Sequence, residues 1–227
     1  MKKISWVQLC FTFVGVFLGA GFVSGQELWK FFACFGAAGL AGFLVSAVIM
    51  TAAHGALLGL VRSTGEARIG FLMTRGDSSL LRTALLALQY LFLFGVVVIM
   101  IAGAAESLSG LTGLSTILLG AIVTLVIFVL ALCGLQSLVA SFSALVPVIT
   151  VCAVIIAGVV ISGGKGQTAE FAPEASLLRP NWYVSAATYA AYNLFGSLTT
   201  MIPLAEHIPD GKTLRKGLLS GSVVLLL

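Results

Sequence analysis

Charged residues are scarce in this chain: Asp, Glu, Lys and Arg make up 9% of its 227 residues, whereas soluble domains contain about 25%. Hydrophobic residues account for 59%. The few charges lie in short stretches, and several of the runs between them reach the roughly 20 apolar residues that cross a bilayer. This pattern excludes a soluble domain on a single anchor and predicts a polytopic membrane protein.

The chain also lacks the sequence patterns of common enzymes. It has no Gly-x-Ser-x-Gly elbow, no phosphate loop ending in Gly-Lys-Ser/Thr and no acidic cluster for a catalytic metal. Its four cysteines all fall inside apolar runs, which favours packing over a disulfide framework, and no Cys/His spacing indicates zinc. The net charge of +4 comes without a clustered basic surface for nucleic acid. We therefore expect no enzyme, no cofactor, no metal and no nucleic-acid partner.

Apolar runs and their Gly and Pro punctuation predict an all-α fold of seven helical segments. These segments are residues 4–35, 37–61, 83–105, 114–132, 138–162, 182–208 and one that begins near Leu214. The charge-free run 107–164 is long enough for two spans, which we expect to be joined by a hinge at 134–137. The last segment is apolar up to Leu227 but about half as long as a span, so we expect the chain to be part of a longer protein.

Lysine and arginine are distributed unevenly between the two sides of the predicted bundle. With a cytoplasmic N-terminus, nine lie inside, namely Lys2, Lys3, Arg62, Arg68, Arg75, Arg82, Lys212, Arg215 and Lys216, and three lie outside, namely Lys30, Lys165 and Arg179. The positive-inside rule selects this orientation in the cell membrane. A cleaved signal peptide would also fit the basic start and the apolar run after it, but cleavage would delete a span that this count needs.

Two predicted spans carry glycine and polar residues at bilayer depth. Four glycines fall within residues 15–25, and each costs a helix about 1 kcal/mol relative to Ala. The run 192–200 combines glycine with amide and hydroxyl side chains. Close packing of helices is the structural alternative. Because both runs occur in spans that correspond in an inverted repeat, we predict that helices 1 and 6 are broken near 19–25 and 193–197 and that the breaks approach one another.

A broken helix exposes unpaired backbone N–H and C=O groups, which can hold anionic and cationic groups of a solute. At membrane depth such backbone is tolerated only where it is buried or lines a cavity. The residues we expect to contact a small-molecule solute are Gly19, Ala20, Gly21, Phe22 and Ser24 in the first break and Asn193, Phe195, Gly196 and Ser197 in the second.

Glu27 and His54 are ionisable residues within predicted spans, and such residues are functional candidates by default. Glu27 could take up a proton or face a cationic solute, but Ser24-x-x-Glu27 also fits a capping box at a helix start. His54 could carry a proton or serve as an interior hydrogen-bonding group. We assign both residues to ion or proton coupling, with these structural roles as the alternatives.

The residues of the first glycine run carry a resemblance to known families. Gly19-Ala20-Gly21-Phe22 is similar to the Gly-Ala-Gly-hydrophobic signature of the amino acid/polyamine/organocation transporters. The longer run 19–27, together with 193–203, resembles the YkvI-type family of uncharacterised bacterial membrane proteins, and the likeness extends over the whole chain. Amino-acid permeases usually continue with a small residue, Leu and Pro after the break. This chain has Ser-Gly-Gln-Glu there, which departs from that pattern.

The resemblance implies a LeuT-like inverted repeat of about ten transmembrane helices in a bacterial cytoplasmic membrane. This chain would hold about six and a half of them: a first five-span repeat (1–162), an external loop (163–181) and the start of a second repeat (182–227). The implied function is secondary active transport of a small organic solute, with an amino acid or related compound as a candidate, coupled to a proton or sodium gradient. A solute-sensing receptor on the same fold is the main alternative, and a channel is a further one, although no ring-type filter repeat is visible.

Overall fold

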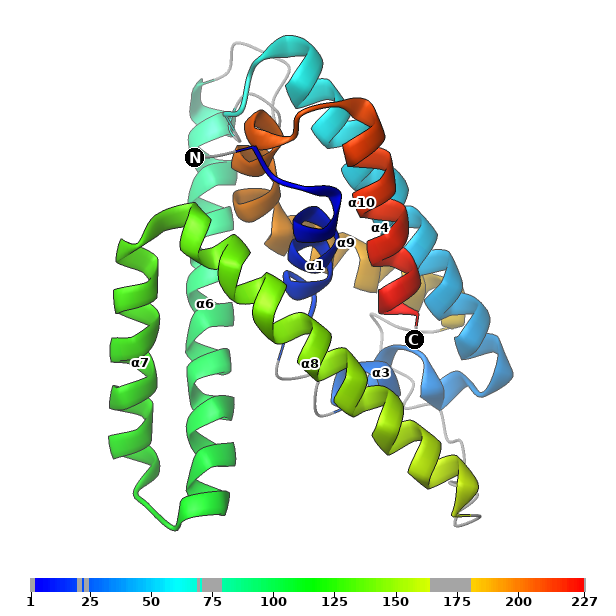
Figure 1. Ribbon diagram of the computed structural model, residues 1–227, viewed down its shortest axis with the longest axis vertical. Coiled ribbons are helices and arrows are strands. Elements are labelled where there is room, and N and C mark those ends of the chain that lie inside the picture. Colours follow the sequence, from blue (N-terminus) through cyan, green and yellow to red (C-terminus); the bar gives the residue numbers. More distant parts are fainter. Residues whose placement is uncertain are drawn as a thin grey trace.

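The computed structural model describes residues 3–19, 22, 25–68, 70, 79–163 and 181–226. Every regular element in these residues is helical, as predicted (Figure 1). The elements are α1 (Trp6–Gly15), α3 (Gln26–Phe31), η1 (Ala33–Phe35), α4 (Ala37–Thr64), α6 (Ser79–Thr112), α7 (Thr116–Leu132), α8 (Gly134–Ser162), α9 (Trp182–Leu204), η2 (Ala205–His207) and α10 (Gly211–Leu225). Here η1 and η2 are short 3-10 helices.

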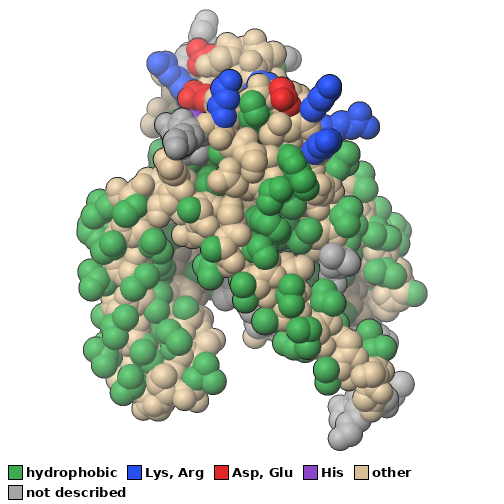
Figure 2. All heavy atoms as spheres, in the orientation of Figure 1, with side chains coloured by type: hydrophobic (Ala, Val, Ile, Leu, Met, Phe, Trp, Pro, Cys, Tyr) green, Lys and Arg blue, Asp and Glu red, His purple; other side chains and the backbone are tan. Residues whose placement is uncertain are grey.

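Three of the described helices, α4, α6 and α8, are long and apolar enough to cross a bilayer. Helix α7 is apolar but has 17 residues. Helices α6, α7 and α8 turn most of their side chains outward, and hydrophobic side chains cover much of the face in Figure 2. An outward apolar surface of this extent suits lipid rather than water. The predicted membrane character is therefore confirmed.

The connection between α7 and α8 lies where the sequence predicts a hinge. Helix α7 ends at Leu132, and α8 begins at Gly134. The backbone of Gly134 has a φ of 74°, in the left-handed region that glycine adopts without a steric cost. A single glycine is thus sufficient to divide the charge-free run into two helices.

The prediction that helix 6 is broken near 193–197 is wrong, because α9 runs without interruption from Trp182 to Leu204. The two polar side chains at the predicted break, Asn193 and Ser197, each have a partner within the helix. Asn193 Nδ2 donates to the Tyr189 carbonyl at 3.0 Å, and Ser197 Oγ lies 3.0 Å from the Leu194 carbonyl. The helix accommodates these groups without unwinding. The regular α-helix ends instead at Leu204, directly after Pro203, and η2 follows.

Helices α1 and α3 lie within the first predicted span. Helix α1 ends at Gly15, and α3 begins at Gln26. Between them, residues 16–19 are not helical. The predicted break at 19–25 also contains residues 20, 21, 23 and 24, which lie outside the described residues, so it stays a prediction. Residues 164–180 of the predicted external loop also lie outside them.

Helix α1 lies in the middle of the bundle, against α8 and α10 (Figure 1). Its approach to α10 depends on two glycines spaced four residues apart. A Cβ at Gly217 would lie 2.7 Å from the Leu9 side chain, and one at Gly221 would lie 2.6 Å from Phe13. The small residues therefore allow contact that any larger side chain would prevent.

The start of α1 and the connections near α9 and α10 meet at one end of the molecule. The Ile4 N–H donates to the His207 carbonyl at 3.0 Å, and Arg62 Nη2, in the last turn of α4, donates to the Pro209 carbonyl at 3.4 Å. Figure 2 shows Lys and Arg side chains gathered at the top of the view, where α4 ends and α10 begins in Figure 1. This grouping is what a positive-inside arrangement requires, while the orientation itself stays a prediction.

Candidate functional site

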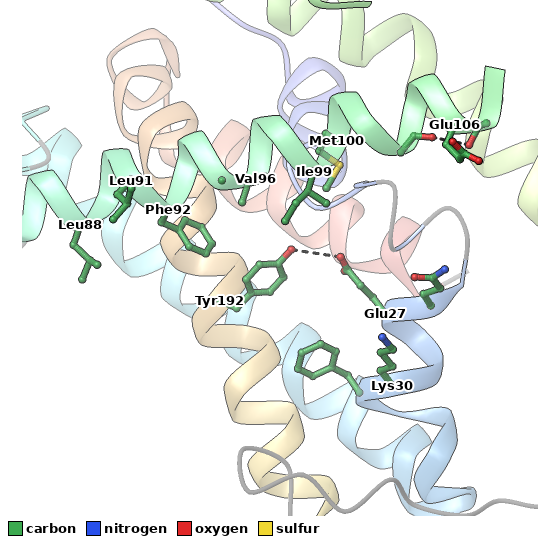
Figure 3. Close-up of a pocket in the computed structure, with 15 residues that line it drawn as sticks. Glu27, Lys30, Leu88, Leu91, Phe92, Val96, Ile99, Met100, Glu106 and Tyr192 are labelled. Carbon is green, nitrogen blue, oxygen red and sulfur yellow. Dashed lines mark hydrogen bonds between the residues drawn. The ribbon is translucent and has the colours of Figure 1, made fainter. Parts of the chain in front are cut away.

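A groove of about 830 Å³ lies between α3, α6 and α9 (Figure 3). Most of its wall is apolar and comes from α6. Among the described residues, its polar lining is Gln26, Glu27, Lys30, Glu106, Ser107 and Tyr192. A concave apolar site with a few convergent polar groups is the usual form of a small-molecule site. The groove is therefore the candidate functional site.

Glu27 and Tyr192 face each other in this groove, from α3 and α9 (Figure 3). The Tyr192 hydroxyl donates to Glu27 Oε1 over 3.4 Å, a long hydrogen bond. The N-cap of α3 is Gly25, with a φ of 75° and no side-chain cap. A capping box from Ser24 to Glu27 would need the helix to start one residue earlier. Glu27 is therefore placed toward the groove and α9, and Ser24 itself lies outside the described residues.

Phe92 of α6 forms an aromatic contact with α9 beside this pair. Its ring lies 5.9 Å from the Tyr192 ring and 5.2 Å from the Phe195 ring, both in edge-to-face arrangements. Aromatic pairs of this geometry contribute about 0.5–1.5 kcal/mol beyond their buried area. Gly196 adjoins the contact, because a Cβ there would lie 3.5 Å from Phe92.

Tyr189 lies one turn before Tyr192 on α9 and is fully buried. Its ring packs 5.2 Å from Phe31 and 4.9 Å from Phe32. Within the described part of the chain, its hydroxyl has no hydrogen-bond partner. Buried hydroxyls are normally paired. This oxygen is thus a polar group beneath the groove that a water or another donor could satisfy.

His54 and Ser197 form a second polar pair, between α4 and α9. His54 Nδ1 lies 2.8 Å from the Met50 carbonyl, and Nε2 lies 2.7 Å from Ser197 Oγ. A carbonyl can only accept, so Nδ1 carries a proton, and in the neutral ring Nε2 accepts from the serine hydroxyl. Phe13 and Phe17 enclose the ring at 5.3 and 5.6 Å. Both ring nitrogens are therefore satisfied in a fully buried setting.

The predicted solute residues divide between several places. A Cβ at Gly19 would lie 2.6 Å from the Met100 methyl of α6, and Phe22 packs partly buried against the core. The other three predicted residues of the first break, Ala20, Gly21 and Ser24, lie outside the described residues.

The second predicted group, Asn193, Phe195, Gly196 and Ser197, lies on the unbroken α9, so its backbone supplies no unwound donors.

The structure brings Glu27 to Tyr192 and His54 to Ser197, as two separate pairs. Among the described residues, no hydrogen bond joins Glu27 to His54, and no group of three or more His, Cys, Asp and Glu side chains could hold a metal ion. Sequence reasoning did not identify Tyr192 as the partner of Glu27 or Gln89 as a contact of α9. The available signal was that Tyr192 and Gln89 are polar residues inside apolar runs.

The chain is similar to an uncharacterised membrane protein, YkvI of Bacillus subtilis, at 28% identity over 232 residues. The matched region covers 99% of this chain and 64% of the relative, so the chain spans less than two thirds of that protein's length. No family model and no solved structure matches the chain. The similarity supports a YkvI-like membrane family.

Proposed function

We propose that this chain is part of a secondary active transporter that moves a small organic solute across the cell membrane, coupled to a proton or sodium gradient. The observation that carries the proposal is the groove in which Glu27 meets Tyr192, within a helical bundle whose exterior is apolar. A carboxylate in such surroundings is costly, so an ionisable residue there is a functional candidate by default. The similarity to a membrane protein is consistent with this role.

The fold we propose is the LeuT-like inverted repeat, with residues 182–227 forming the start of the second repeat. Two features support it. Helix α1 ends at Gly15, the backbone of residues 16–19 is not helical, and α3 contacts α9. A helix interrupted beside a groove offers backbone groups to a solute in addition to side chains. In this arrangement the solute occupies the groove between α3, α6 and α9.

Glu27 is the proposed coupling residue because its carboxylate reaches the groove. It binds a proton or a cation there, and Tyr192 orients it through the hydroxyl. His54 is enclosed by Phe13, Phe17 and Ser197. Its proposed role is to hold α4 and α9 together, with proton uptake as the alternative role.

Solute flux in proteoliposomes made with the full-length protein tests the proposal. Uptake of radiolabelled amino acids and amines is measured under an imposed proton or sodium gradient. We expect gradient-driven accumulation by the native protein and its loss in Glu27→Gln, with the folded yield retained. Glu66→Gln is the control, because Glu66 is exposed and is not among the residues that line the groove.

Two results would contradict the proposal. Undiminished gradient-driven uptake by Glu27→Gln would remove Glu27 from coupling. Saturable binding without accumulation would favour a solute-sensing receptor over a transporter.

A further inference from the structure

Gln89 is a fully buried polar residue on a helix that is otherwise largely exposed. Of the 34 residues of α6, Gln89 and Ala105 are buried. Gln89 Nε2 donates to the Phe195 carbonyl of α9 at 2.6 Å. An interhelical hydrogen bond at this depth is a specific link, because few other polar partners exist in hydrocarbon surroundings.

The chemistry of the amide fixes its orientation. The Phe195 carbonyl can only accept a hydrogen bond, so the NH₂ group of Gln89 must face it, and a flipped amide would place two oxygens against each other. Gln89 Oε1 then has no hydrogen-bond partner among the described residues. A buried unpaired oxygen is unfavourable. Gln89 therefore holds α9 through its Nε2, while its Oε1 stays unpaired.

This link lies beside the candidate site. Phe92, about one turn further along α6, packs its ring on both Tyr192 and Phe195. Gln89 and Phe92 thus join α6 to the segment of α9 that carries Tyr192, and the Tyr192 hydroxyl reaches Glu27 on α3 (Figure 3). The hydrogen bond to Glu27 is long, so a small shift of α9 would break it.

We propose that Gln89 is a positioning residue of the groove: its bond to the Phe195 carbonyl holds α9 where the Tyr192 hydroxyl reaches Glu27. It acts through α9, and its side chain is not one of those that line the groove. The inference rests on the groove as the proposed solute site, but it concerns only the geometry of the groove. The flux experiment can therefore fail while the test below succeeds, and the reverse also holds.

A double-mutant cycle tests the positioning without any solute. Melting temperatures of the full-length protein are measured for Glu27→Leu, which removes the acceptor, for Tyr192→Phe and for both together, first with Gln89 and then with Gln89→Met. Methionine keeps the approximate length and volume but removes the donor. We expect the two substitutions to be non-additive with Gln89, because they share one hydrogen bond, and additive with Gln89→Met.

If Gln89 had only a packing role, Gln89→Met would lower the melting temperature and leave the non-additivity of the two other substitutions unchanged. Non-additivity that persists in Gln89→Met would therefore overturn the proposal, and so would additivity in the protein that retains Gln89. Gln136→Met is the control, because Gln136 is exposed on α8 and should leave the cycle intact. If Gln89→Met does not fold, Gln89→Asn replaces it, since its amide is one methylene too short for Phe195, and the same two outcomes apply.

Discussion

The imidazole Nε2 of His54 lies 2.7 Å from the hydroxyl oxygen of Ser197, and the two residues are 143 positions apart in the chain. Both are buried: His54 has no exposed surface, and 2% of the Ser197 surface is exposed. The Leu194 carbonyl, 3.0 Å from Ser197 Oγ, offers the hydroxyl proton a second acceptor. The pair therefore joins α4 to α9 by a hydrogen bond that can persist with the ring neutral or charged, because the hydroxyl can donate to either neighbour.

We expect Ser197→Ala to lower the free energy of unfolding by about 1–3 kcal/mol, because it leaves His54 Nε2 buried without a partner. Ser162→Ala, at the exposed end of α8, should change it by no more than about 0.5 kcal/mol. Unfolding in mixed micelles measures both. Equal effects of the two substitutions would show that the His54 contact does not stabilise the fold.

Gly217→Ala and Gly221→Ala should each destabilise the protein by about 1–3 kcal/mol, the usual cost of forcing extra atoms into a packed interface. The added Cβ would lie within 3 Å of the Leu9 side chain at Gly217 and of Phe13 at Gly221. Gly59→Ala is the control, because a Cβ at Gly59 has nothing within 4 Å and alanine favours a helix. Thermal melting should show that Gly59→Ala melts at a higher temperature than the other two variants. A Gly59→Ala protein as unstable as the other two would contradict the prediction.

Acid should weaken the start of α10. Asp210 caps this helix by accepting a hydrogen bond from the Thr213 N–H at 2.6 Å. This bond holds the pKa of the Asp210 carboxyl below its usual value. A lowered folded-state pKa stabilises the protein above the unfolded value of about 3.9 and loses this effect as the pH falls through the folded value.

The Asp210 prediction is checked by melting temperatures at pH 7 and pH 3. Asp210→Asn keeps a good capping side chain without a titrating group. The difference in melting temperature between the native protein and this variant should therefore disappear only in acid. Asp210→Ala should melt lower than the native protein at pH 7. An identical pH response of the native protein and Asp210→Asn would rule out the proposed linkage.

The predicted orientation places the start of α6 in the cytoplasm. In intact cells, an impermeant maleimide should therefore fail to label Ser79→Cys, and it should label Leu111→Cys, at the opposite end of the same helix. Leu111 is 84% exposed and is the second-last residue of α6, so it lies at the helix end and not in the middle of the span. The unsubstituted protein sets the background from the native cysteines. The reverse labelling pattern would invert the topology.

Local sequence patterns determined the class of the fold and most helix positions. The predicted segment 37–61 matches α4, 114–132 matches α7, and 138–162 matches α8 to within a few residues. Helix ends were readable because glycine, proline and polar loop residues act on the backbone next to them. The glycine at 134 is an example, since its positive φ depends on its own lack of a Cβ.

Composition gave a wrong prediction where the structure depends on more than neighbouring residues. The glycine and polar content of 193–197 predicted a break, but the Asn193 side chain bonds to a carbonyl of α9 itself, Ser197 has acceptors in Leu194 and His54, and the helix continues. Near-neighbour patterns cannot distinguish a polar residue that unwinds a helix from one that the helix satisfies. That outcome depends on which groups surround the residue.

The sequence by itself determined that this is a helical membrane protein, and it identified Glu27 and His54 as ionisable residues at depth. Only the tertiary structure decided their partners. Tyr192 lies 165 positions from Glu27, and Ser197 lies 143 positions from His54. Apolar periodicity specifies which residues form a helix, but the rotation and register of packed helices decide which side chains meet, and these depend on contacts such as Gln89 with Phe195 and Leu9 with Gly217.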